Sequence, residues 1–123
     1  MKIGVVGLGK MGANVALNLM DHGHEAVGFD ASAEAREKAA REGITAVASM
    51  AELVGSLTAP RVLWVMVPSG AATEACFTEA LELLEPGDVL VDAGNSMYKD
   101  SLRRAQVAQK AGVRFLDAGT SGG

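Results

Sequence analysis

The fold is decided by the amino-terminal stretch Lys2-Ile3-Gly4-Val5-Val6-Gly7-Leu8-Gly9-Lys10-Met11-Gly12. The apolar run before Gly7 predicts a short buried strand, and the residues after Gly12 predict a helix. Gly7 permits the tight turn, Gly9 leaves its backbone open to a close ligand, and Gly12 allows the helix to pack on the strand. The N–H groups and the positive dipole end at the start of that helix favour an anion. The stretch therefore predicts a dinucleotide-binding turn.

An acidic residue stands where such a site contacts the adenosine ribose. Asp30 ends the next apolar run and lies 18 residues beyond Gly12, near the spacing of about 20 that is typical of this class of site. A carboxylate there accepts hydrogen bonds from ribose hydroxyls and repels a 2′-phosphate, so we expect NAD rather than NADP to bind. Arg36 follows one turn into the next predicted helix, within reach of such a phosphate. The alternative for Asp30 is a solvated strand end or a helix cap.

The composition argues against several kinds of partner. The 123 residues, 49% hydrophobic and 21% charged, are typical of one globular domain. The net charge of −4 argues against a nucleic-acid surface, and no apolar run approaches the roughly 18 residues of a membrane span. One cysteine excludes an internal disulfide, and two histidines without partner ligands do not suggest a metal site. A first strand at Lys2 leaves no room for a signal peptide, and we expect a cytoplasmic protein.

Strand and helix patterns alternate along the whole chain. This alternation predicts an α/β fold, a doubly wound parallel sheet of Rossmann type with three αβα layers and strand order 3-2-1-4-5-6, over a single domain of residues 1–123. The strongest predicted strand is the apolar run 62–67. Ligands of such sheets bind at the carboxyl ends of the strands, which selects four loops: Gly7–Gly12, Asp30–Ser32, Val67–Gly70 and Asp92–Ser96. The basic residues Lys99, Arg103 and Arg104 are interpreted as a solvated helix face.

Three of these loops, with the last residues of the sequence, resemble one enzyme superfamily. The glycine turn, with methionine before its last glycine, resembles that of the β-hydroxyacid dehydrogenases, and Val65-Met66-Val67-Pro68-Ser69-Gly70 resembles their second cofactor loop. The block Asp92-Ala93-Gly94-Asn95-Ser96-Met97-Tyr98-Lys99-Asp100-Ser101 and the final Gly119-Thr120-Ser121-Gly122-Gly123 resemble the 6-phosphogluconate dehydrogenase branch. Sister enzymes for 3-hydroxyisobutyrate or tartronate semialdehyde usually carry a Ser-Thr pair in place of Asn95-Ser96.

The resemblance implies a set of binding residues. Those expected to bind the cofactor, NAD, are Gly7, Leu8, Gly9, Lys10, Met11, Gly12, Asp30, Val67, Pro68, Ser69 and Asn95. Those expected to bind a phosphorylated sugar acid are Asn95, Ser121, Gly122 and Gly123. No catalytic residue is assigned to this chain, because the family's catalytic groups belong to a helical carboxyl-terminal domain without counterpart here. The resemblance also implies a homo-oligomeric parent enzyme.

The implied reaction is the NAD-dependent oxidative decarboxylation of 6-phosphogluconate to ribulose 5-phosphate, by a parent protein of which this chain is the coenzyme domain. Alone, the chain is expected to be inactive. Two alternatives stay open at this point. One is the NAD-binding domain of a 3-hydroxyisobutyrate or tartronate semialdehyde type of dehydrogenase. The other is a stand-alone dinucleotide-binding sensor without chemistry.

Overall fold

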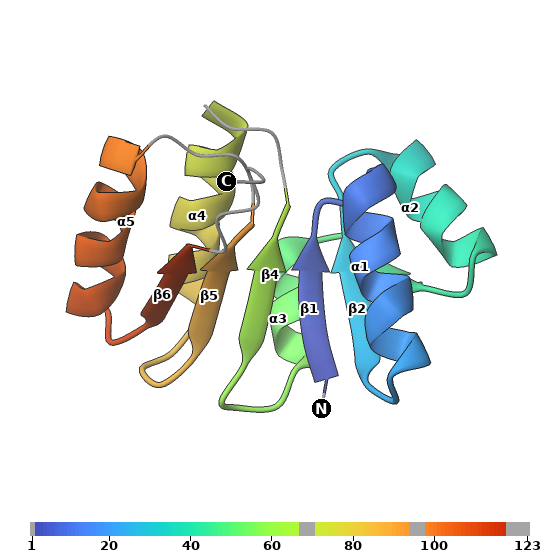
Figure 1. Ribbon diagram of the computed structural model, residues 1–123, viewed down its shortest axis with the longest axis horizontal. Coiled ribbons are helices and arrows are strands. Elements are labelled where there is room, and N and C mark those ends of the chain that lie inside the picture. Colours follow the sequence, from blue (N-terminus) through green and yellow to red (C-terminus); the bar gives the residue numbers. More distant parts are fainter. Residues whose placement is uncertain (1, 67–70, 94–97, 118–123) are drawn as a thin grey trace.

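A parallel six-stranded sheet organises the chain (Figure 1). The computed structural model describes residues 2–66, 71–93 and 98–117. Along these residues the elements are β1 (Lys2–Val6), α1 (Lys10–Asp21), β2 (Glu25–Phe29), α2 (Ala33–Arg41), β3 (Thr45–Val47), α3 (Met50–Ser56), β4 (Val62–Val65), α4 (Ala71–Leu83), β5 (Val89–Asp92), α5 (Tyr98–Lys110) and β6 (Arg114–Asp117). The strand order β3-β2-β1-β4-β5-β6 confirms the predicted doubly wound fold.

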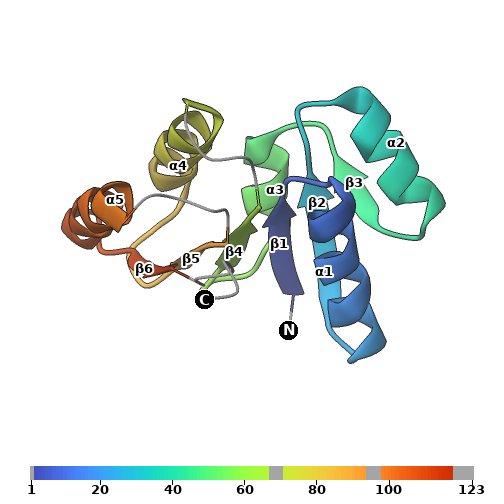
Figure 2. The same cartoon turned by 45° about the horizontal axis from the view of Figure 1, so that its top comes forward.

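Helices cover both faces of the sheet, as the alternating pattern predicts (Figure 2). The face packed against α3, α4 and α5 holds the larger apolar cluster, which includes Val6, Val27, Leu53, Leu63, Val65, Phe77, Ala80, Leu90 and Ala108. The face packed against α1 and α2 holds a smaller one, made of Val5, Leu8, Ala13, Ala16, Ala26, Ala39 and Ile44. Burial of these two clusters fixes the register of the sheet, because a slip of one residue would turn each strand's apolar set to the other face.

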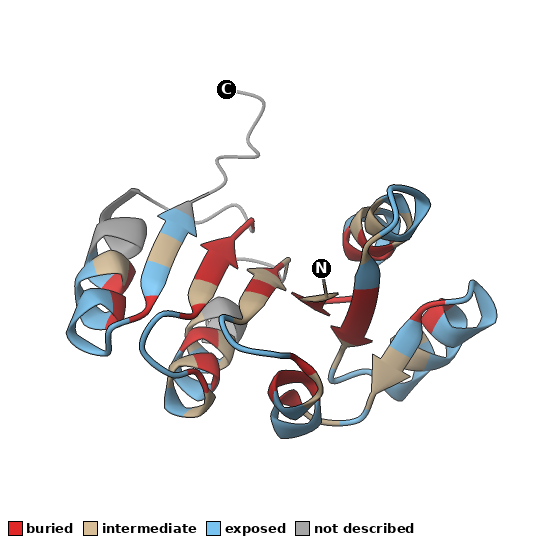
Figure 3. Cartoon of the chain, turned by 90° about the horizontal axis from the view of Figure 1, so that it is seen from below, coloured by how far each residue is buried: buried red, intermediate tan, exposed pale blue. Residues whose placement is uncertain are grey.

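The two halves of the sheet are covered unequally on the α1 side. The strand register aligns Val5, Trp64, Val91 and Leu116 in one row across β1, β4, β5 and β6. Helix α1 packs over β1 and β2, but within the described ranges no helix lies over β4, β5 and β6 on this side (Figure 3). On this side Trp64 is half-buried and Leu116 is 51% exposed, whereas Val91 between them is buried.

Serine side chains begin two of the helices. The Ser32 hydroxyl accepts a hydrogen bond from the Ala35 N–H at 3.2 Å, and the Ser49 hydroxyl accepts one from the Glu52 N–H at 3.1 Å. Each bond satisfies one of the N–H groups that the first turn of a helix leaves without an intrahelical partner. Helices α2 and α3 therefore begin at side-chain caps.

The start of α1 and the end of β4 differ from the sequence-based expectation. Helix α1 begins at Lys10 and thus includes the last glycine of the turn, whereas the prediction began at Ala13. Strand β4 ends at Val65, although the Met66 N–H still donates to the Val6 carbonyl at 2.7 Å. Val67, the predicted last residue of that strand, lies outside the described residues. None of the helices described is both long and apolar enough to cross a membrane.

Candidate functional site

The turn after β1 needs glycine at two positions for reasons internal to the fold. Gly7 has a φ of +96°, a conformation that L side chains rarely adopt, while its N–H donates to the Phe29 carbonyl at 2.8 Å. A Cβ atom on Gly12 would lie 1.8 Å from the Gly7 carbonyl oxygen. The first turn of α1 is thereby packed against the end of β1.

The middle glycine of the turn has no such internal reason. Gly9 has a φ of −66°, which any residue can adopt, and a Cβ atom built on it meets nothing within 4 Å. It is also the N-cap of α1, and glycine has no side chain with which to accept from the helix amides. The first turn carries no acidic residue either. The positive end of α1 is therefore open on the side where Gly9 leaves free space.

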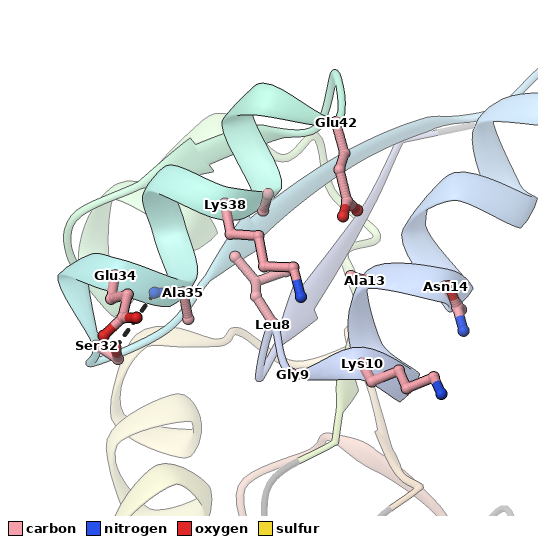
Figure 4. A pocket seen from close by; sticks show the side chains of 11 residues that line it. Leu8, Gly9, Lys10, Ala13, Asn14, Ser32, Glu34, Ala35, Lys38 and Glu42 are labelled. Atoms are coloured by element: carbon pink, nitrogen blue, oxygen red, sulfur yellow. Dashed lines mark hydrogen bonds between the residues drawn. The ribbon is translucent and has the colours of Figure 1, made fainter.

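A cleft of about 300 Å³ lies between α1 and α2, next to this open helix end (Figure 4). Lys10 extends along the first turn of α1, while Lys38 of α2 points into the space between the helices. The residues that line the cleft are Leu8, Gly9, Lys10, Ala13, Asn14, Ser32, Glu34, Ala35, Lys38, Ala39 and Glu42. The cleft thus joins the glycine turn to the start of α2.

The Asp30 carboxylate connects the two loops that border the cleft. Its Oδ2 atom accepts from the Leu8 N–H and its Oδ1 atom from the Ser32 N–H, both at 2.8 Å. Hydrogen bonds to an ionised acceptor are stronger than neutral ones. A carboxylate offers about four acceptor positions, so two of those on Asp30 remain for other donors. Asp30 therefore holds the glycine turn against the end of β2 and keeps capacity for a ligand hydroxyl.

The Arg36 guanidinium lies against the loop that follows β2. Its Nη1 atom donates to the Asp30 carbonyl at 2.7 Å and to the Ala31 carbonyl at 3.3 Å. The guanidinium thus stabilises the loop that precedes α2.

The remaining predicted site residues fall into two groups. Met11 lies in the first turn of α1 and is 62% exposed, whereas the Leu8 side chain is buried beneath the turn. Val67, Pro68, Ser69, Asn95, Ser121, Gly122 and Gly123 lie outside the described residues. Asn14 and Lys38, which line the cleft, were not singled out from the sequence, because a polar residue on an amphipathic helix carries no signal of what it faces.

The interpretation of Arg104 as part of a solvated helix face was wrong. Arg104 is 1% exposed, and its guanidinium contacts Glu74 of α4 and Asp92 at the end of β5. Arg103 also binds Glu74, and this hydrogen bond is the largest influence on the Glu74 carboxyl, lowering its pKa against the opposing effect of burial. The side chain of Lys99 lies outside the described part of the chain. The carboxylates of Glu74 and Asp92 are far from Arg104 in sequence, so a local charge pattern could not reveal these contacts.

The chain has the features of a dinucleotide-binding Rossmann domain. These are a doubly wound sheet, an open helix N-terminus behind a glycine turn, and an acidic residue at the end of β2. The family model described as the NAD binding domain of 6-phosphogluconate dehydrogenase matches residues 2–123. The chain belongs to this family.

Relatives with curated names agree with that membership. A 6-phosphogluconate dehydrogenase of Haloferax volcanii, named NAD(+)-dependent and decarboxylating, is 45% identical over all of this chain, which covers 40% of that protein. The decarboxylating 6-phosphogluconate dehydrogenase of Trypanosoma brucei brucei is 39% identical, and there the chain covers 27%. The chain therefore spans between about a quarter and two fifths of the length of the curated relatives that it matches.

Solved structures with the same fold include two dehydrogenases. The 6-phosphogluconate dehydrogenase of Plasmodium falciparum superposes with a TM-score of 0.88 at 26% identity, over 94% of this chain and 26% of that one. The 3-hydroxyisobutyrate dehydrogenase of Mycobacterium tuberculosis superposes with a TM-score of 0.85 at 31% identity, over 94% of this chain and 39% of that one.

Within the described residues, no cluster of three His, Cys, Asp or Glu side chains that could hold a metal ion is found.

Proposed function

We propose that this chain is the coenzyme domain of an NAD-dependent, decarboxylating 6-phosphogluconate dehydrogenase. The observation that carries the cofactor-binding part of the proposal is the glycine turn, and the substrate is proposed from the family and its relatives. The fold itself requires glycine at positions 7 and 12, but nothing in the described protein requires it at position 9, beside the open end of α1. A ligand that must approach the backbone there explains the third glycine.

The proposed contacts follow from this geometry. The backbone at Gly9, Lys10 and Met11, at the start of α1, would bind the pyrophosphate, with Leu8 packed beneath the turn. Asp30 would accept from the adenosine ribose while keeping its two bonds to the loop amides. Val67, Pro68, Ser69 and Asn95 would follow the cofactor toward its nicotinamide, at the carboxyl ends of β4 and β5. Asn95 with Ser121, Gly122 and Gly123 would bind the sugar acid beside it.

We propose NAD as the preferred cofactor because of Asp30. A 2′-phosphate would meet the Asp30 carboxylate, and one nitrogen of the neighbouring Arg36 guanidinium is already hydrogen-bonded to the loop backbone. The name of the Haloferax relative supports NAD, whereas the Plasmodium structure has NADP+ as its cofactor.

In the longer parent protein, the reaction would convert 6-phosphogluconate to ribulose 5-phosphate and CO2. When bound, NAD would accept a hydride from C3 of the substrate; this domain holds the cofactor and orients it. The general acid and base would come from a helical carboxyl-terminal domain, consistent with the greater length of the relatives. We propose a homo-oligomeric cytoplasmic enzyme, with the chain itself inactive.

The second candidate is the coenzyme domain of a 3-hydroxyisobutyrate dehydrogenase. The Mycobacterium tuberculosis enzyme favours it, since its identity to this chain exceeds that of the Plasmodium structure. The sequence relatives at 37 to 45% identity carry the 6-phosphogluconate name instead, as does the family model.

Calorimetric titration of the chain tests the cofactor assignment. NAD should bind with a dissociation constant at least tenfold below that of NADP, since the loss of a charge-assisted hydrogen bond corresponds to about 1.5–3 kcal/mol. Equal or tighter binding of NADP would overturn the preference, and no binding of either would overturn the proposal. A spectrophotometric assay of the parent protein with 6-phosphogluconate and 3-hydroxyisobutyrate separates the two substrates. The 123-residue chain should form no NADH from either.

A further inference from the structure

Arg104 is a charged side chain buried at the junction of three elements. It extends from α5, and its Nε and Nη2 atoms lie 2.9 and 2.8 Å from Oε1 of Glu74 in α4. Its Nη1 atom lies 3.3 Å from Oδ2 of Asp92, the last residue of β5. Figure 1 shows α4 and α5 beside this part of the sheet. One guanidinium thus ties two helices to the carboxyl end of one strand.

Water hardly reaches the contact between Arg104 and Asp92. The side chains of Arg104 and Asp92 are 2% and 4% exposed. The void that both of them border, together with Phe77 and Phe115, measures about 10 Å³, at the lower limit of the space that one water molecule needs. The two charges are therefore held by protein groups.

Holding α5 on the sheet does not require an arginine. Well-packed apolar residues of similar volume commonly stabilise a fold as well as a buried ion pair, because a buried pair must offset the desolvation of both charges. What an ion pair adds is direction, since hydrogen bonds fix a carboxylate at one position and orientation. The residue so fixed here is Asp92, and the next residue is anchored as well, because the Ala93 N–H donates to the Val65 carbonyl at 2.9 Å.

The end of β5 is a place where position matters for function. Ligands of such sheets bind at the carboxyl ends of the strands. The glycine turn and Asp30 lie at the ends of β1 and β2, and the order of the sheet places β4 and then β5 on the opposite side of β1 from β2. A dinucleotide whose adenosine half lies at Asp30 therefore extends its nicotinamide half toward the ends of β4 and β5.

We propose that Arg104 is a positioning residue that acts through Asp92. It fixes the carboxyl end of β5, at Asp92 and Ala93, beside the nicotinamide half of the bound cofactor. The inference rests on the proposed function, because it requires that the domain bind NAD. It adds a residue on the side of α5 that faces α4 and β5, and this residue acts through another.

Arg103 provides a matched control. It is the next residue in the same helix, has the same charge and also binds Glu74, but its side chain is 55% exposed. The variants to compare are Arg104→Met, Arg104→Lys and Arg103→Met. ADP serves as a second ligand, because it carries the adenosine and pyrophosphate of NAD and lacks the nicotinamide half.

The readout is saturation-transfer NMR on bound NAD, with calorimetric titrations of NAD and ADP. In Arg104→Met, we expect the saturation of the nicotinamide protons relative to the adenine protons to fall at least about threefold. The affinity for NAD should fall roughly tenfold, while the affinity for ADP should stay within about twofold of the wild type. Arg103→Met should match the wild type in all three measurements. Arg104→Lys should lie between, because lysine keeps the charge without the planar set of donors.

Each other outcome overturns a distinct claim. Suppose that the wild type binds NAD. If Arg104→Met then matches the wild type in all three measurements, or if it weakens the binding of ADP and NAD equally, the positioning role is wrong while the proposed function stands. If the wild type binds neither NAD nor ADP, the proposed function fails and this inference fails with it. Thermal unfolding shows whether Arg104→Met folds. If it does not, Asp92→Asn replaces it, with the same expected loss at the nicotinamide protons and the same overturning result.

Discussion

The carbonyl oxygen of Gly7 occupies the space that a side chain on Gly12 would need. A Cβ atom on Gly12 would lie 1.8 Å from that oxygen and 2.9 Å from the Gly7 carbonyl carbon. Both contacts are with backbone, which cannot rotate away as a side chain can. The relation joins the first turn of α1 to the end of β1, and any side chain at position 12 must separate the two.

Gly12→Ala is therefore expected to destabilise the fold. Overpacking against backbone should lower the free energy of unfolding by about 3 kcal/mol or more, measured by urea denaturation. Gly55→Ala is the control, because Gly55 lies within α3 and a Cβ atom there meets nothing within 4 Å. That substitution should raise stability by about 0.5–1 kcal/mol. A Gly12→Ala variant as stable as the wild type would show that the turn can open without loss.

Gly9→Ala should separate binding from folding. The backbone at Gly9 suits any residue and the space beside it is open, so the change in stability should stay below about 1 kcal/mol. A methyl group at the pyrophosphate position should nevertheless weaken NAD binding by roughly tenfold or more. Thermal unfolding and calorimetry on the same preparation check both parts. NAD affinity that survives the substitution would place the pyrophosphate elsewhere.

Asp30→Ala should affect both the loop and the ligand. It removes the acceptor of the Leu8 and Ser32 N–H groups, which should lower stability by about 1–3 kcal/mol. It should also reduce the preference for NAD over NADP by roughly tenfold. Glu34→Ala is the control, since Glu34 lines the same cleft and its loss removes the same charge. An unchanged NAD-to-NADP ratio in Asp30→Ala would leave Asp30 with only its role in the loop.

Asp88, which precedes β5 at the amino end of that strand, should make the stability of the fold depend on pH. Its side chain is 1% exposed, and this burial alone would raise its pKa. The carboxylate also accepts hydrogen bonds from the backbone N–H groups of Glu85 and Arg61 and from the Arg61 guanidinium. These hydrogen bonds outweigh the effect of burial, so the pKa of Asp88 is lowered. A lowered pKa means that the stabilisation is present above the pKa of the unfolded carboxyl, about 3.9, and is lost as the pH falls through the folded-state pKa.

Asp88→Asn should therefore cost about 1–3 kcal/mol at pH 7, and the gap to the wild type should shrink as the pH falls below about 4. Urea denaturation at pH 7 and pH 3 measures this. Glu85→Gln is the control: its ion pair with Arg61 spans 3.9 Å and its side chain is 68% exposed, so a change within about 0.5 kcal/mol is expected. A gap that stays constant with pH would mean that the Asp88 charge is not what stabilises the fold.

The sheet topology could be predicted because it depends on local signals. Alternating strands and helices imply parallel strands with right-handed crossovers, and the glycine turn identifies the central first strand. The helix starts at Ser32 and Ser49 likewise depend on hydrogen bonds that reach only three residues along the chain.

Contacts between distant residues could not be predicted in the same way. Arg104 belongs to a helix whose neighbouring residues are mostly polar, so it resembles the exposed side of that helix. Its partners Glu74 and Asp92 lie 30 and 12 residues away, and only the packing of α4 and α5 on β5 brings them together. Arg36 shows the same limit, because the sequence gives its reach but not the backbone carbonyls that it binds.

The uneven cover of the sheet gives the chain a built-in optical probe. Trp64, its single tryptophan, is half-buried on the side of β4 over which no described helix lies. Indole emission shifts to shorter wavelength when the ring leaves water, and quenchers such as iodide then reach it less easily. The fluorescence of this protein therefore reports on one half of one face of its sheet, without a label or a substitution. If a segment of this polypeptide or of another covers that face, the emission maximum of Trp64 should move to shorter wavelength.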